Sequence, residues 1–141
     1  MTSIDWDALA RAAIATRERA HAPYSRYRVG AALLTDEGVV FSGCNVENAT
    51  YGLTICAERT AVVSMVAAGG KRVAAIAVVT RGPTAGSPCG ACRQTLAEFA
   101  GDAPVLMLAV DDAGVIIDRR QSSVDTLLPD AFRGDCLLGG G

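Results

Sequence analysis

Three cysteines and one glutamate are the residues of this sequence whose types and spacing could carry metal-dependent chemistry. Glu58 follows two residues after Cys56, and Cys89 and Cys92 form a C-x-x-C pair further along the chain. Thiolates bind zinc strongly, and three protein ligands leave one coordination position for water, whereas a structural zinc site takes four ligands. A carboxylate beside the ligands can reach that water without binding the metal. The pattern therefore predicts a hydrolytic zinc site.

The same residues allow other interpretations, which the sequence alone leaves open. A closed structural zinc site would need a fourth ligand, for which the candidates are a carboxylate, His21, Cys44 and Cys136. Cys44 also suits a small core residue at a strand end, and Glu58 suits a solvated residue at a helix amino terminus. Three thiolates around Zn²⁺ carry net negative charge. Arg59 is the candidate that compensates this charge, unless it is an ordinary arginine on a helix surface.

Size and composition indicate one globular domain. The chain has 141 residues, of which 50% are hydrophobic and 20% are charged, and its net charge is -2. Because no run of lysine or arginine appears, we do not expect polymeric nucleic acid as a partner. The apolar stretches are too short to cross a bilayer, and no leader-like segment opens the sequence. Five cysteines, an odd number, suit metal binding in a reducing compartment, so we expect a soluble cytoplasmic protein without a membrane partner.

Hydrophobic periodicity predicts helices and strands in an order that places both metal-binding segments at helix amino termini. The predicted helices span 6–20, 56–68 and 89–100. The predicted strands span 28–34, 39–45, 73–80, 105–110 and 115–118, the first two joined as a hairpin. Ser122 or Ser123 can cap a short last helix that ends at Leu128 and Pro129. Helix amino termini carry partial positive charge, which favours the thiolate form of cysteine.

The links between these elements predict the fold. The link 111–114 is so short that it can join its strands only antiparallel, since a parallel crossover needs a dozen residues or more. A helix intervenes between 73–80 and 105–110, which favours a parallel pair. We expect a three-layer α/β/α domain over 1–141, with a five-stranded mixed sheet whose last strand is antiparallel. The tail from about residue 134 is expected to be flexible, and its glycines from Gly139 disordered.

These residues resemble the zinc signature of cytidine deaminases. The signature is carried by Cys56-Ala57-Glu58 and by Pro88-Cys89-Gly90-Ala91-Cys92-Arg93-Gln94, and its three-cysteine form is similar to that of the small homotetrameric branch. Further matching segments lie at 22–25, 29–32, 43–49, 51–52 and 127–132, so the resemblance covers about residues 5–133. It implies the cytidine deaminase fold and one Zn²⁺ per subunit. It also implies hydrolytic deamination of free cytidine and 2'-deoxycytidine to the uridine nucleosides, with release of ammonia, in pyrimidine salvage.

The resemblance implies roles for residues around the base. Glu58 would take a proton from zinc-bound water, deliver it to ring N3 and later protonate the departing amine while hydroxide attacks C4. The backbone N–H of Ala57 would hold O2 of the base, and a carbonyl near Ser87 would accept from the exocyclic amine. Tyr27 stands where the family usually has phenylalanine, stacking on or near the base. Its hydroxyl must therefore find a partner or water.

The resemblance also implies how the sugar is held. Asn45 and Glu47 resemble the ribose-binding pair, since an amide and a carboxylate can both bind sugar hydroxyls, although turn formation is the alternative. Ala49 and Tyr51 would face the 5'-hydroxyl of a neighbouring subunit's substrate, and Phe132 would pack on a neighbour's base. We therefore expect a homotetramer in which neighbouring subunits complete each site.

Three competing functions remain at this point. A deaminase of a cytosine-containing antibiotic nucleoside would share the metal chemistry but replace the sugar-binding elements, and the pair Asn45 and Glu47 argues against it. An editor of cytosine in RNA or DNA would need a basic groove. A non-enzymatic zinc-binding interaction module would release no ammonia, and replacing Glu58 would then affect stability alone.

Overall fold

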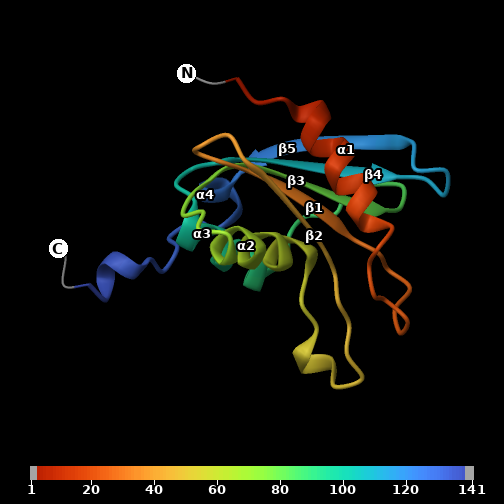
Figure 1. Ribbon diagram of the computed structural model, residues 1–141, viewed down its shortest axis with the longest axis horizontal. Helices are drawn as coiled ribbons and strands as arrows, with labels where there is room; N and C mark the ends of the chain where they lie inside the picture. Colours follow the sequence, from red (N-terminus) through yellow and green to blue (C-terminus); the bar gives the residue numbers. More distant parts are fainter. Residues whose placement is uncertain (1–2, 139–141) are drawn as a thin grey trace.

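A mixed sheet lies between two layers of helices in the computed structural model, which describes residues 3–138 (Figure 1). Within that range the sheet has five strands in the order β2-β1-β3-β4-β5. The strands are β1 (Gly30–Thr35), β2 (Val40–Cys44), β3 (Val73–Arg81), β4 (Pro104–Val110) and β5 (Ile116–Ser123). The helices are α1 (Trp6–Arg17), α2 (Ala57–Ala67), α3 (Gly90–Phe99) and α4 (Val124–Leu127), with short 3-10 turns η1 (Tyr51–Leu53) and η2 (Gly134–Cys136).

Strand directions follow the lengths of the connections. β1 pairs antiparallel with both β2 and β3, β3 pairs parallel with β4 across the helix α3, and β4 pairs antiparallel with β5 across a short turn. The three-layer α/β/α fold with an antiparallel last strand is thus confirmed. The expectation for the glycines from Gly139 falls outside the described residues.

Alternating side chains of the sheet build two cores, one on each face. Leu9 and Ala13 of α1 pack with residues such as Val79 and Leu108. On the other face α2 and α3 contribute residues such as Met65 and Leu96, which pack with Leu33, Ile76 and Met107. Figure 1 shows α1 on the side of the sheet opposite to α2 and α3. Because both helices that begin with a predicted zinc ligand lie on one face, the ligands can meet.

Gly43 allows α2 to approach the sheet closely. A Cβ placed on Gly43 would lie 2.7 Å from the carbonyl oxygen of Ala57, in the first turn of α2, which is closer than real Cβ contacts. The missing side chain therefore lets the amino-terminal turn of α2 rest directly on β2. This contact fixes the height of the turn that carries Cys56 and Glu58 above the sheet.

Several predicted boundaries were wrong by a few residues. The first helix ends at Arg17 rather than near Ala20, and β5 extends to Ser123 rather than to Asp118. The second half of β5 carries exposed polar side chains, so it lacks the apolar alternation from which strands are predicted. Ser123, one of the two predicted caps, does cap α4 by accepting from the backbone N–H of Thr126. In the described part of the chain, no helix has the length and apolar character needed to span a membrane.

Candidate active site

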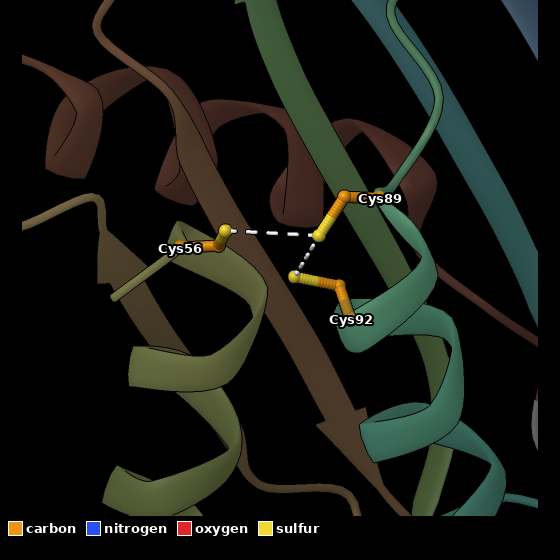
Figure 2. A group of neighbouring side chains, drawn as sticks. All are labelled: Cys56, Cys89 and Cys92. Atoms are coloured by element: carbon orange, nitrogen blue, oxygen red, sulfur yellow. Dashed lines mark hydrogen bonds between the residues drawn. The ribbon is translucent and has the colours of Figure 1, made fainter. Parts of the chain in front are cut away.

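Three thiols meet where two neighbouring helices begin (Figure 2). Cys56 is the residue before the first turn of α2, Cys89 holds the same position in α3, and Cys92 lies in the first turn of α3. The sulfur of Cys89 lies 3.9 Å from that of Cys56 and 3.4 Å from that of Cys92. All three sulfurs lie within 4.8 Å of one another. The predicted cluster is therefore assembled by the fold.

The donor set fits zinc. Three sulfurs on a tetrahedral zinc, each at about 2.3 Å from the metal, stand roughly 3.8 Å apart, which is close to the separations in this cluster. Among the described residues, the metal-binding group contains these three cysteines and neither His21, Cys44 nor a carboxylate. The side chain of Cys136 is outside what the structure describes. The fold therefore brings together the three thiols that the sequence predicts as zinc ligands.

Arg59 contacts the thiol cluster directly. Its Nη2 lies 3.6 Å from the sulfur of Cys56 and donates to the carbonyl of Thr54 at 3.3 Å. Hydrogen bonds from Cys92, and further ones from Arg59 and Cys89, lower the pKa of Cys56 to about 5. The pKa of Cys92 is raised because its thiol donates to Cys56 and because it is buried. Arg59 is therefore placed to offset negative charge at the cluster.

Glu58 is buried beside the cluster rather than solvated. The residue is 5% exposed, and burial raises the pKa of its carboxyl group above the ordinary value. The negative charge of Cys56 raises this pKa further. A carboxyl group with a raised pKa can both accept and return a proton near neutral pH, which suits general acid–base chemistry.

A cavity of about 270 Å³ opens in front of the cluster. Of the residues predicted for the site, those that line it are Cys56, Ala57, Glu58, Cys89, Tyr27, Asn45, Glu47 and Ser87. The other lining residues are Ser25, Val29, Thr54, Val78 and Thr80. Sequence reasoning did not select Thr80, although it is the single polar residue that ends the apolar strand segment 73–80. The described lining includes neither Ala49 nor Phe132.

Asn45 and Glu47 are held in place by the segment that carries Tyr27. The Asn45 amide accepts from the N–H of Val29 at 2.9 Å and donates to the carbonyl of Tyr27 at 2.8 Å. Glu47 accepts from the N–H groups of Tyr24 and Ser25 and from the hydroxyl of Ser25. These hydrogen bonds lower the pKa of Glu47, and the bond from the Ser25 hydroxyl has the largest effect. Both side chains keep capacity for further hydrogen bonds toward the cavity.

The Tyr27 hydroxyl lies close to the loop that carries Ser87. A Cβ built on Gly86 would lie 3.3 Å from the Tyr27 hydroxyl oxygen and 3.2 Å from the Thr80 hydroxyl oxygen. The absence of a side chain at Gly86 therefore makes room for the Tyr27 phenol.

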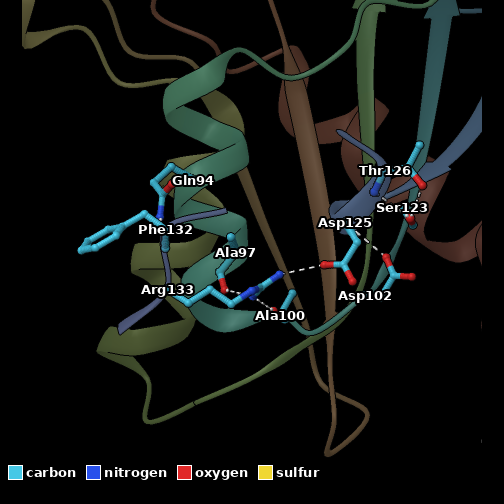
Figure 3. A network of polar contacts seen from close by, with 9 residues as sticks. All are labelled: Gln94, Ala97, Ala100, Asp102, Ser123, Asp125, Thr126, Phe132 and Arg133. Carbon is cyan, nitrogen blue, oxygen red and sulfur yellow. Dashed lines mark hydrogen bonds and ion pairs between the residues drawn. The ribbon is translucent and has the colours of Figure 1, made fainter. Parts of the chain in front are cut away.

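Tyr51, Ala49 and Phe132 are exposed and do not belong to the described lining of the cavity in their own chain. Tyr51 is 71% exposed and lies in the segment between β2 and α2 that extends from the body of the molecule, drawn in yellow in Figure 1. It lines an adjoining hollow that shares Ser25, Glu47 and Thr54 with the cavity. Its ring packs edge-on against Tyr24, with ring centroids 5.8 Å apart. Phe132 is 59% exposed, and Figure 3 shows its ring pointing away from α3.

The backbone around Phe132 is nevertheless anchored. Gln94 donates to the Phe132 carbonyl at 2.7 Å, and Arg133 donates to the carbonyls of Ala97 and Ala100 at the end of α3. The same guanidinium pairs with Asp125 at 2.7 Å (Figure 3). A helix end leaves carbonyl groups without intrahelical partners, so Arg133 both satisfies them and fixes the position of Phe132.

Comparisons with known proteins agree on one family. Residues 4–108 match the family model described as the cytidine and deoxycytidylate deaminase zinc-binding region. A cytidine deaminase of Halalkalibacterium halodurans is 44% identical over 94% of this chain and 97% of its own, and one of Mycobacterium tuberculosis is 42% identical over 97% and 96%. The crystal structure of cytidine deaminase from Burkholderia pseudomallei superposes with a TM-score of 0.81 at 50% identity, covering 94% of this chain and all of that one.

Proposed function

Because this chain belongs to the cytidine and deoxycytidylate deaminase family, we propose that it hydrolyses free cytidine and 2'-deoxycytidine to uridine and 2'-deoxyuridine, releasing ammonia. The observation that carries the proposal is the buried carboxyl group of Glu58, which lines the same cavity as Cys56 and Cys89. A purely structural zinc site needs no such group. Membership of a zinc-dependent deaminase family also favours an enzyme over a non-enzymatic zinc-binding module.

Cys56, Cys89 and Cys92 would hold zinc, which would supply the Lewis acidity that makes water nucleophilic at neutral pH. Glu58 accepts a proton from the attacking water and delivers it to N3 of the base, which makes C4 more electrophilic. Once the water oxygen has bonded to C4, the Glu58 carboxylate takes the remaining proton from that oxygen and passes it to the amine, which leaves as ammonia while the C4 carbonyl forms. Burial supports this double role, since it raises the pKa of Glu58 and so favours the protonated form that must donate to N3 and to the amine.

Other lining residues orient the nucleoside. The N–H of Ala57 binds O2 of the base, a carbonyl near Ser87 accepts from the exocyclic amine, and the Tyr27 ring stacks on or near the base. Asn45 and Glu47 bind the ribose hydroxyls. The lowered pKa of Glu47 supports this role, because a carboxylate that stays ionised accepts hydrogen bonds from both hydroxyls.

The assembly we propose is a homotetramer in which Ala49, Tyr51 and Phe132 serve neighbouring sites. Their exposure in the single chain supports this arrangement. We further propose that the enzyme acts in the cytoplasm, in pyrimidine salvage, without a nucleic-acid or membrane partner. The Asn45 and Glu47 pair disfavours an antibiotic nucleoside as the main substrate.

An ultraviolet assay of the zinc-loaded protein tests the function. Cytidine and 2'-deoxycytidine should be consumed, whereas cytosine, which lacks a sugar, and cytidine monophosphate should react far more slowly. Glu58→Gln should lower kcat by about 10²–10⁴, the usual contribution of general acid–base catalysis, with zinc still bound. Glu98→Gln, which changes an exposed glutamate of α3, is the matched control and should retain activity. A holoprotein that leaves both nucleosides intact would contradict the proposal.

A further inference from the structure

A second cavity of about 550 Å³ lies beside the candidate active site and is lined by arginine. It is formed where the end of α1, the segment 20–28, the end of β3 and the turn between β4 and β5 come together. Its charged lining residues are Arg17, Arg26, Arg28 and Arg81, with the carboxylates Glu18 and Asp112. Four arginines and two carboxylates leave positive charge in excess, in a chain whose net charge is -2.

This cavity is separate from the candidate active site. The two share none of their described lining residues. They lie on the two sides of one segment, because Ser25, Tyr27 and Val29 line the active-site cavity whereas Arg26 and Arg28 line the second one. The proposed deamination does not use any of these arginines, so their gathering here needs another explanation.

Arg17 contributes a positively charged side chain to the cavity lining, and a backbone hydrogen bond holds it in place. Its side chain is 10% exposed, and its Nε donates to the carbonyl of Arg28 at 2.9 Å. That bond uses one of the five N–H donors of a guanidinium, and the residue still lines the cavity. A buried guanidinium that is oriented by the backbone loses little further freedom when it binds an anion.

The carboxylates are easily displaced from the arginines. Glu18 lies 3.7 Å from Arg17 and 3.9 Å from Arg28, and its side chain is 64% exposed. Asp112 pairs with Arg81 at 2.8 Å, and its side chain is 82% exposed. The two pairs with both partners exposed, Arg28–Glu18 and Arg81–Asp112, contribute about 0–1 kcal/mol each, so an incoming anion can replace them at small cost.

Arg26 supports the same interpretation. Its φ of 58° lies in the left-handed region, which glycine or asparagine adopts more readily than arginine. Glycine at this position would relieve the backbone strain. The chain instead carries Arg26, whose side chain lines the cavity.

From these observations we propose that the cavity defined by Arg17, Arg26, Arg28 and Arg81 binds the phosphate group of a small anion, either inorganic phosphate or a phosphomonoester. Arginine binds phosphate oxygens in a bidentate manner, and three separate segments supply the donors. The cavity volume lies in the range of small-molecule sites, so it has space for the organic part of a phosphomonoester. The inference stands whether or not the proposed deaminase activity is correct.

Calorimetric titration of the zinc-loaded protein at low ionic strength tests this site. The probes are inorganic phosphate and adenosine 5'-monophosphate, which carries no cytosine and is therefore not turned over by the proposed activity. We expect saturable binding that weakens as salt is added. Tighter binding of the nucleotide would assign the site to organic phosphates, and equal binding would assign it to inorganic phosphate.

Paired variants identify the site. Arg26→Gln with Arg81→Gln should weaken binding at least about tenfold, since both lost contacts are charge-assisted. Arg11→Gln with Arg119→Gln removes the same charge from exposed positions outside the cavity lining and should leave binding unchanged. Replacing Arg26 and Arg81 with lysine should restore part of the affinity. Zinc content and thermal unfolding establish that each variant is folded. Absence of saturable binding in the unmodified protein, or an equal loss in both glutamine pairs, would overturn the proposal.

Discussion

The hydrogen bond from the Ser25 hydroxyl helps to keep the Glu47 carboxylate ionised as pH falls. It is the largest of the causes that lower the pKa of Glu47. A carboxyl group whose folded pKa is depressed contributes stability above its unfolded pKa, and that contribution is lost as pH falls through the folded value. Glu47 therefore stays ionised, and able to accept the hydrogen bonds proposed from ribose, at lower pH than an ordinary carboxyl group.

Ser25→Ala should raise the pKa of Glu47 and increase KM for cytidine with a smaller change in kcat. The shift should be partial, because the N–H groups of Tyr24 and Ser25 still donate to the carboxylate. A carbon-13 NMR titration of the Glu47 carboxyl group measures the pKa directly. Ser25→Thr retains a hydroxyl and should behave like the unmodified protein. An unchanged Glu47 titration in Ser25→Ala would contradict this account.

Arg59 should affect turnover without controlling zinc retention. The guanidinium lies against Cys56, and its Nε is buried with no hydrogen-bond acceptor among residues 3–138. Removing it leaves more negative charge on the thiolates and weakens the metal as a Lewis acid. Arg59→Gln should therefore lower kcat about 10–100-fold, the usual effect of losing a group that contacts metal ligands, at an unchanged ratio of zinc to protein. Exposed Arg19→Gln is the control, and normal turnover of Arg59→Gln would remove the tuning role.

The close contact of α2 with β2 sets the position of the turn that carries Cys56 and Glu58. Gly43→Ala would drive a methyl group into the backbone of α2, which cannot move aside as a flexible side chain could. We expect a loss of about 1–3 kcal/mol in the free energy of unfolding and a drop in kcat of up to about 100-fold, because small displacements of catalytic groups are costly. Thermal unfolding and steady-state kinetics measure both effects.

Gly101→Ala provides the matched control for that substitution. An added Cβ at Gly101 would make only ordinary contact, 3.8 Å from the Arg72 guanidinium. This variant should keep both stability and turnover. If Gly43→Ala behaved in the same way, the glycine would not be what positions α2.

The starts of α2 and α3 could be predicted from sequence because their signals are local. Each has helical apolar spacing and ends next to glycine, so Cys56 and Cys89 were correctly placed at helix amino termini. The polar half of β5 was missed because exposed edge strands lack that spacing. Thr80 and Ser25 were not selected for the cavity, since the cavity that they line with Glu58 is formed by segments distant in sequence. The burial of Glu58 likewise depends on that packing.

For the whole molecule, the exposed apolar residues indicate surfaces that association would cover. Val63 and Val66 of α2 are 56% and 46% exposed, and Leu53 in the extended segment is 62% exposed. The aromatic side chains of Tyr51 and Phe132 are also exposed, and aromatic residues are enriched in subunit interfaces. In a homotetramer the anchored Phe132 would reach a neighbour's base, so each catalytic site would depend on more than one chain.

Mixed oligomers test that dependence. Glu58→Gln subunits lack the acid–base group of their own site, and Phe132→Ala subunits lack the contact that they would offer to a neighbour, so each protein alone should be weakly active. When the two are co-expressed with different tags, roughly a quarter of sites should regain both groups if the subunits assemble at random. Co-expression of Glu58→Gln with Glu47→Gln should give no such gain, because both residues act in the site of their own chain and every mixed site lacks one. Activity of the first mixture that does not exceed that of its parents, in oligomers shown by native mass spectrometry to be mixed, would mean that each chain completes its own site.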